Sequence, residues 1–197
     1  MRRGFVLGGV VAGAILILLG VGSIVVGASG RSEVQDRIAD EQIVGTPDMT
    51  PDATQAAVKE AGLTDVEIPD CSVADEKIDT GSEAKCFASY MRIHALESTG
   101  GKVYSEMPRA VFEKTGKPVP EDKAAVALEN GTAIDNPERQ TWVTETALST
   151  ALNTSYFAEQ VSDFGIAMGI ALVLIGIGLL VLTFGALRPR LASRERG

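Results

Sequence analysis

Two long runs of uncharged, largely apolar residues stand at the two ends of the chain and enclose a polar middle. The first run extends from Gly4 to Gly30, and the second covers the 24 residues from Phe164 to Leu187. At a rise of about 1.5 Å per residue, a helix of this length crosses a hydrocarbon core of roughly 30 Å. The pattern therefore predicts two transmembrane helices, over residues 4–29 and 164–187.

The N-terminal run has a second interpretation as a cleaved signal peptide, with Gly27, Ala28 and Ser29 as the processing site. The apolar core of a signal peptide is roughly 7–15 residues long. Because this run is longer, we interpret it as an uncleaved anchor. The second run lies at the opposite end of the chain, where a signal peptide does not occur. Membrane attachment is therefore expected under either interpretation.

Arginines are distributed unevenly about the two predicted spans. Six of them lie at the outer ends of the chain, whereas the side between the spans carries only Arg31 and Arg37 close to the membrane. By the positive-inside rule, this asymmetry places residues 1–3 and the basic tail 188–197 in the cytoplasm. Residues 30–163 then form an extracytoplasmic domain of a multi-pass protein of the plasma membrane.

The residues between the spans are strongly acidic. Residues 31–163 hold 12 lysines and arginines against 25 aspartates and glutamates, a net charge of −13. Nucleic acids and anionic lipid surfaces both require a basic surface on the protein. The composition therefore excludes nucleic acid as an expected partner. We expect the partners to be the lipid bilayer around the spans, together with another membrane protein or further copies of this chain.

Glycines recur at regular intervals in both predicted spans, and the residues between them are mainly large and apolar. The spacing is 4-7-7 in the first span and 4-7 in the second, as seen in Gly9, Gly13, Gly20 and Gly27 and in Gly165, Gly169 and Gly176. Small residues at such spacing allow two helix backbones to approach closely. The alternative is that glycine is simply frequent in membrane helices. We predict that the two spans pack as an antiparallel helical hairpin.

Helical periodicity and capping residues also recur in the middle of the chain, so the inserted domain is predicted to be small and mainly α-helical. The expected helices cover Arg31 to Ile43, Thr50 to Ala61, Ser82 to Ser98, Pro120 to Asn130, and Asn136 onward into the second span. The first and last of these are expected to pack together as a stalk. In the last one, the spacing places Leu148 and Leu152 on the buried face and Glu145 on the outer face.

Cys71 and Cys86 are the two cysteines of the chain, and both fall in the predicted extracytoplasmic domain. Two thiols in an oxidising compartment most simply form a disulfide. A catalytic redox role is the alternative, but the chain has no C-x-x-C motif. The spacing therefore favours a structural disulfide.

Candidate chemistry is sparse. His94 is the one histidine of the chain, whereas non-haem iron and zinc sites of the usual kinds need more histidine or cysteine ligands. No nucleophile elbow, Walker loop or dinucleotide-binding glycine motif is present. We therefore predict no enzyme activity, no metal and no cofactor, although an enzyme of another type stays open. His94 is expected to be a hydrogen-bonded core or interface residue.

Several residues around His94 resemble a pattern in uncharacterised actinobacterial membrane proteins. In that pattern a helix A-x-x-Y-A-x-x-I-x-x-H precedes a turn G-G-K-x-Y-x-E. The matching residues here are Ala84, Phe87-Ala88, Ile93-His94 and Gly100 to Glu106, with near-membrane counterparts at Asp36 to Ile43 and Arg139 to Tyr156. This chain departs from the pattern because Phe87 replaces the usual tyrosine and Ile93 directly adjoins His94. The resemblance implies a two-span topology and a cell-envelope origin, without an established activity.

Two classes of function remain open on these observations. The first is a non-catalytic envelope protein, an accessory or scaffold subunit that packs against membrane partners. The second is an extracytoplasmic sensor or ligand-binding module, which would act through a partner because the tail 188–197 is too short for an output domain. The predicted interaction surface consists of Tyr90, His94, Lys102, Tyr104 and Glu106.

Overall fold

The computed structural model describes residues 2–185, and the chain is mainly helical, as predicted. The long helices are α1 (Arg2–Asp40) and α5 (Pro137–Gly185); the shorter elements are α2 (Pro51–Glu60), α3 (Gly81–Ser98), the 3-10 turn η1 (Tyr104–Glu106), β1 (Ala110–Phe112), α4 (Glu121–Glu129) and β2 (Ala133–Asp135). Met1, the predicted tail 188–197 and the last two residues of the second predicted span lie outside the described residues.

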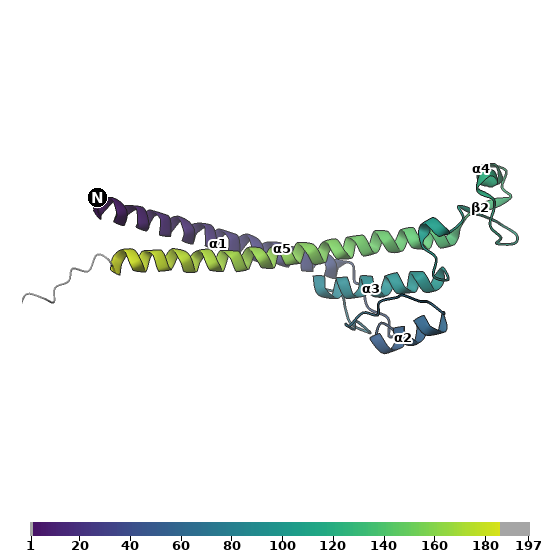
Figure 1. The fold of residues 1–197 in the computed structure, drawn as a ribbon, viewed down its shortest axis with the longest axis horizontal. Coiled ribbons are helices and arrows are strands. Elements are labelled where there is room, and N and C mark those ends of the chain that lie inside the picture. Colours follow the sequence, from purple (N-terminus) through teal and green to yellow (C-terminus); the bar gives the residue numbers. More distant parts are fainter. Residues whose placement is uncertain (1, 186–197) are drawn as a thin grey trace, which may run out of the picture. The chain divides into compact units, whose positions relative to one another are not determined.

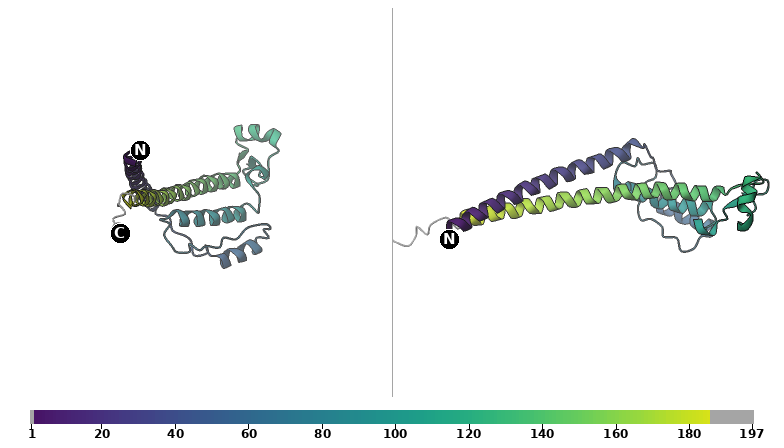
Figure 2. Two further views of the ribbon diagram at one scale, coloured as in Figure 1. Left: turned by 60° about the vertical axis from the view of Figure 1, so that its left-hand side comes forward. Right: turned by 90° about the horizontal axis from the view of Figure 1, so that it is seen from above.

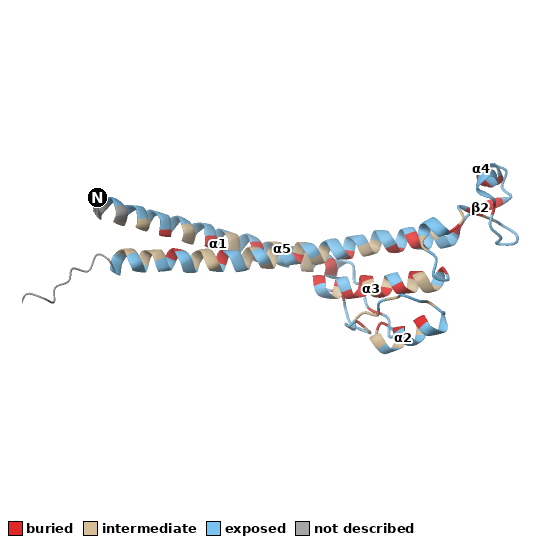
Figure 3. Ribbon diagram, in the orientation of Figure 1, coloured by how far each residue is buried: buried red, intermediate tan, exposed pale blue. Residues whose placement is uncertain are grey.

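Both α1 and α5 are long and apolar enough to cross a membrane, which confirms this part of the sequence prediction. Their most apolar stretches have mean hydropathies of 2.6 and 2.7. Much of the ribbon of both helices is coloured as exposed (Figure 3). The exposed residues include large apolar ones, for example Leu18 at 73% and Leu182 at 72%. Each helix also continues without interruption into polar sequence, α1 as far as Asp40 and α5 from Pro137.

The chain divides into two compact units. The two-helix unit contains residues 1–34 and 158–197, and the central domain contains Gln35–Phe157. The predicted domain boundaries, 30–163, enclose the whole central domain. The few additional residues on either side of it belong to the two-helix unit.

In the two-helix unit, α1 and the C-terminal part of α5 lie side by side (Figures 1 and 2). Ser23 Oγ donates a hydrogen bond of 2.7 Å to the carbonyl oxygen of Gly165 on the other helix. Arg31 forms ion pairs with Glu159 at 3.3 Å and with Asp163 at 2.8 Å. Polar contacts therefore join the helices where the apolar runs end.

The helices α2 and α3 form one part of the central domain and pack against each other. Thr50 caps α2 as predicted, because its side chain accepts a hydrogen bond from the Ala53 N–H. The cap of α3 is Thr80. The sequence had suggested that this helix begins at Ser82, so the prediction was two residues late. Thr80 and Glu83 form a reciprocal capping box, in which each side chain accepts from the other residue's backbone N–H.

The core of the central domain lies between α3 and the long connection from α2. Its largest fully buried side chains are Tyr90, Ile78 and Val73. Cys71 and Cys86 are joined by a disulfide, with their Cα atoms 6.2 Å apart, as the sequence predicted. The hydroxyl of Tyr90 donates a hydrogen bond to the carbonyl oxygen of Cys71. The disulfide and this hydrogen bond therefore fix the same segment onto α3.

A small second cluster contains the two strands, which the sequence analysis did not predict. β1 and β2 pair in antiparallel register, with Val111 opposite Ile134. The helix α4 packs on these strands, and the buried residues of the cluster are Ala110, Val119, Ala124, Ala127 and Ala133. Three-residue strands carry too short an alternation to be recognised in a sequence.

Candidate interaction site

A buried glutamate organises the contact between α3 and α5. Glu145 is only 3% exposed, although the helical spacing had placed it on the outer face. Its carboxylate pairs with the guanidinium of Arg92 at 3.4 Å and accepts hydrogen bonds from Ser149 Oγ at 2.8 Å and Thr146 Oγ1 at 3.3 Å. These partners compensate for the desolvation of the carboxylate. The prediction of an outward Glu145 was therefore wrong.

The same arginine also covers the single tryptophan of the chain. The guanidinium carbon of Arg92 lies 3.9 Å from the centroid of the Trp142 ring. Trp142 is buried in a cluster with Ala95 and Met107. Leu152, one turn beyond Ser149, is also buried, as predicted. Trp142 and Ser149 of α5 thus pack on α3, a contact that the sequence did not predict. The predicted stalk joins α5 to the helix after Arg31, and Arg31 itself pairs with Glu159 and Asp163 of α5.

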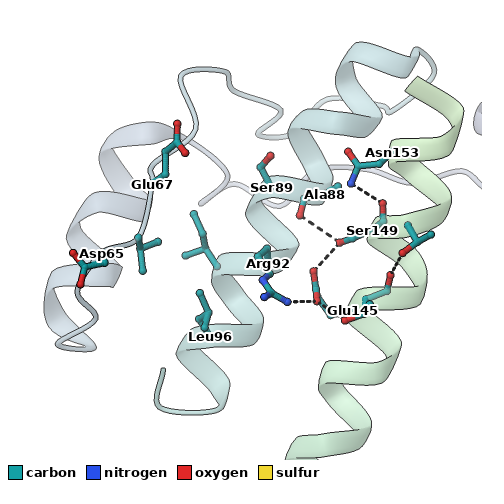
Figure 4. A pocket seen from close by; sticks show the side chains of 13 residues that line it. Asp65, Glu67, Ala88, Ser89, Arg92, Leu96, Glu145, Ser149 and Asn153 are labelled. Carbon is teal, nitrogen blue, oxygen red and sulfur yellow. Dashed lines mark hydrogen bonds and ion pairs between the residues drawn. The ribbon is translucent and has the colours of Figure 1, made fainter. Parts of the chain in front are cut away.

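A groove of about 470 Å³ opens beside this network (Figure 4). Arg92 from α3 and Glu145 from α5 point toward one another on one side, and Asp65 and Glu67 lie on the segment after α2. The groove therefore contains three carboxylates and one guanidinium. This balance of charge favours a cationic ligand over an anionic one.

The predicted interaction surface is not a single patch. Tyr90 is 0% exposed, so its assignment to a surface was wrong: its ring fills the core, and its hydroxyl is bound to Cys71. Burial, together with the negative charge of Asp70, raises the pKa of Tyr90 above its ordinary value. Tyrosine is amphipathic and suits both interfaces and cores, so the residue type alone does not decide between them.

His94 is half-buried, and its Nε2 lies 3.3 Å from a carboxylate oxygen of Asp48. A hydrogen bond from the side chain of Thr46 lowers the pKa of Asp48, whereas partial burial raises it. The backbone N–H of Asp48 and the charge of His94 also lower this pKa, so the net shift is downward. The Asp48 carboxylate thus lies within ion-pair distance of the His94 imidazole. The hydrogen-bonded role expected for His94 stays a prediction.

The remaining three residues of the predicted surface follow α3. Lys102 is exposed. Tyr104 is 42% exposed, and the guanidinium carbon of Arg139 lies 4.0 Å from its ring centroid. The carboxylate of Glu106 accepts a hydrogen bond from the backbone N–H of Val103 at 2.9 Å. Tyr104 and Glu106 thus support the local turn, and Tyr104 also borders α5.

The glycines that were predicted to pack in the membrane lie against the other long helix. A Cβ atom added to Gly20 would lie 2.6 Å from the carbonyl oxygen of Gly169, and one added to Gly13 would lie 3.0 Å from that of Gly176. Gly9 faces Thr183, Gly27 faces Ser162, and Gly165 lies near Gly27. By contrast, Gly4, Gly8, Gly22, Gly178 and Gly185, which the prediction did not include, have no such neighbour within 4 Å.

Among residues 2–185, no three histidine, cysteine, aspartate or glutamate side chains gather as a potential metal site. No protein-family model, curated protein or solved structure matches the chain. The contacts of the described residues are thus the basis for assigning a role.

Sequence reasoning missed the Arg92–Glu145 pair, but a signal for it exists. Between Gln140 and Gln160, α5 contains only two charged residues, Glu145 and Glu159. A lone carboxylate in an otherwise uncharged stretch of an acidic domain indicates a specific partner. In the structure both are buried, and both pair with an arginine.

Proposed function

We propose that this chain is a non-catalytic integral membrane protein of the bacterial cell envelope, an accessory or scaffold subunit. The observation that supports it best is the close packing of α1 on α5 at regularly spaced glycines. Two apolar helices in a bilayer gain little from hydrophobic contact with each other, because the lipid tails are equally apolar. They associate instead through close backbone packing at small residues. Such a hairpin is a rigid membrane anchor for the domain that lies between its helices in the sequence.

The proposed orientation has both termini in the cytoplasm, an antiparallel pair of spans and the central domain outside. The uneven distribution of arginines supports this orientation. The disulfide between Cys71 and Cys86 supports it as well, because structural disulfides persist in oxidising compartments. The strong negative charge of the domain agrees with a location away from the anionic cytoplasmic lipid surface.

Cysteine labelling tests the orientation. In intact cells, we expect a membrane-impermeant maleimide to label a Lys102→Cys variant, because Lys102 is exposed and lies in the central domain. A Ser193→Cys variant in the tail should react only after permeabilisation. The native cysteines do not interfere, since they form a disulfide. Labelling of Lys102→Cys only after permeabilisation would contradict the outward domain.

Purification from native membranes in mild detergent tests the scaffold role. We expect the full-length protein to be recovered with a protein partner in fixed stoichiometry, either a second membrane protein or another copy of itself. Native mass spectrometry measures that stoichiometry. A monomer that carries a bound small molecule would instead support the sensor class of function.

The groove beside Arg92 is the observation that favours the second candidate function, an extracytoplasmic sensor or ligand-binding module. Its three carboxylates and one guanidinium suit a small cation, and Ser89 and Thr146 add hydroxyl groups to its lining. Arg92 already pairs with Glu145 and covers Trp142, so its positive charge is largely compensated within the domain. A ligand would therefore meet mainly Asp65 and Glu67.

A further inference from the structure

One side of α5 in the central domain carries no exposed charge. From Gln140 to Phe157 the helix contains a single charged residue, Glu145, and its side chain is buried. The central domain as a whole is strongly charged, with 11 lysines and arginines against 22 aspartates and glutamates over residues 35–157, a net charge of −11. An uncharged helical surface about 27 Å long at the usual helical rise is therefore unusual in this domain.

The exposed residues of this side follow a coiled-coil spacing. Val143, Ala147, Thr150, Thr154 and Phe157 are separated alternately by four and three residues, and all five are exposed. Val143 is 46% and Phe157 is 68% exposed. An alternation of four and three keeps a stripe of residues facing one partner helix. We call these five residues the α5 strip.

The two threonines of the α5 strip need no water to satisfy their hydroxyl groups. Thr150 Oγ1 donates to the carbonyl oxygen of Thr146 at 2.7 Å, and Thr154 Oγ1 donates to that of Thr150 at 2.7 Å. A hydroxyl that is already bonded within its own helix can be buried without leaving a donor unpaired. The strip is thus more suited to burial than its composition suggests.

The central domain itself leaves the α5 strip uncovered. The contacts with α3 use the other side of the helix, through Glu145 and Ser149. Leu152, on that same side, is buried. At the N-terminal end of the strip, Tyr104 and Trp142 border a mainly apolar hollow of about 490 Å³ that also contains Val143 and Ala147. Both the strip and the hollow are therefore available to another molecule.

We propose that the α5 strip is the interface of a parallel dimer formed by two copies of this chain. The inference rests on the proposed membrane anchoring, because two copies with one orientation in one bilayer present their α5 helices in parallel. Around a two-fold axis, each residue of the interface meets its own copy. A charged residue there would face a like charge, so an uncharged strip is the condition that self-pairing of an acidic domain requires.

Disulfide cross-linking of the full-length protein in membranes tests the contact. We expect a Thr150→Cys variant to form a covalent dimer under mild oxidation. The matched control is Thr144→Cys, which is also exposed and makes the same type of hydrogen bond to the preceding turn but lies off the strip. Equal cross-linking of the two variants, no cross-linking of either, or a product joined to a different protein would overturn the proposal.

Native mass spectrometry of detergent-solubilised protein tests the charge argument separately. The wild-type chain should be dimeric, and Ala147→Glu should raise the dissociation constant of the dimer by at least about tenfold, a loss of about 1.4 kcal/mol of association free energy. Thr144→Glu should leave it unchanged. A monomeric wild-type chain, or equal dimerisation of both variants, would contradict the proposal. Labelling of Lys102→Cys reports on the membrane orientation independently, so failure of one proposal is distinguishable from failure of the other.

Discussion

Replacing Glu145 by lysine should lower the free energy of unfolding of the central domain by about 3 kcal/mol, because it places an uncompensated charge at a buried position beside the half-exposed guanidinium of Arg92. The carboxylate is 3% exposed and accepts from Arg92, Ser149 and Thr146. A lysine ammonium would face the guanidinium of Arg92 as a like charge and could not accept either hydroxyl hydrogen bond. Urea unfolding of the full-length protein in micelles measures the effect.

Trp142 is a suitable fluorescent reporter of this unfolding, because it is the single tryptophan and lies beneath Arg92. Glu145→Gln should cost less, about 1–3 kcal/mol, since the amide oxygen can still accept from Ser149. Thr144→Lys, at an exposed neighbouring position, should stay within about 0.5 kcal/mol of the wild type. Equal stability of Glu145→Lys and Thr144→Lys would show that the α3–α5 contact does not depend on the carboxylate.

A second large effect is expected for Gly20→Ile in the two-helix unit, about 3 kcal/mol of lost packing free energy. A Cβ atom at this position would lie 2.6 Å from the Gly169 carbonyl oxygen and 2.9 Å from the Val173 backbone nitrogen. Both neighbours are backbone atoms, which cannot move aside as a flexible side chain would. The helices must therefore separate to accommodate the branched side chain.

Spin labels on the exposed residues Leu7 and Leu182 report the separation through their distance distribution in lipid nanodiscs. Gly20→Ile should lengthen and broaden that distribution. Gly22→Ile is the matched control, because a Cβ atom at Gly22 has no neighbour within 4 Å. If the two variants give the same distribution as the wild type, close approach at Gly20 does not hold the helices together.

The elements that follow from local rules were predicted well from the sequence. Thr50 with Pro51 marks the start of α2, and the absence of glycine and proline from Arg139 to Asp163 predicts an uninterrupted α5. The cysteine pair was predicted because only one pairing was available. In each case the decisive information lies within a few residues, or in a choice with a single outcome.

Features that depend on partners distant in the sequence were not predictable in the same way. Glu145 is buried beside Arg92, 53 positions earlier. The lone carboxylate in α5 indicates that a partner exists, but no pattern within α5 identifies it as Arg92. Tyr90 is buried because the connection through Cys71 covers it, and the Cys71 carbonyl oxygen accepts a hydrogen bond from its hydroxyl. Periodicity shows which side of a helix is apolar, but it does not show whether a charged residue has a partner across the contact.

The burial of Glu145 also shapes the electrostatic potential around the domain. With its one carboxylate in this stretch turned inward and paired, α5 contributes no negative charge to the outer side between Gln140 and Phe157. Carboxylates elsewhere on the domain act on that side through solvent, where salt screens them over about 8 Å at physiological ionic strength. An anionic surface that approaches along this part of α5 therefore meets only the screened repulsion of carboxylates elsewhere on the domain.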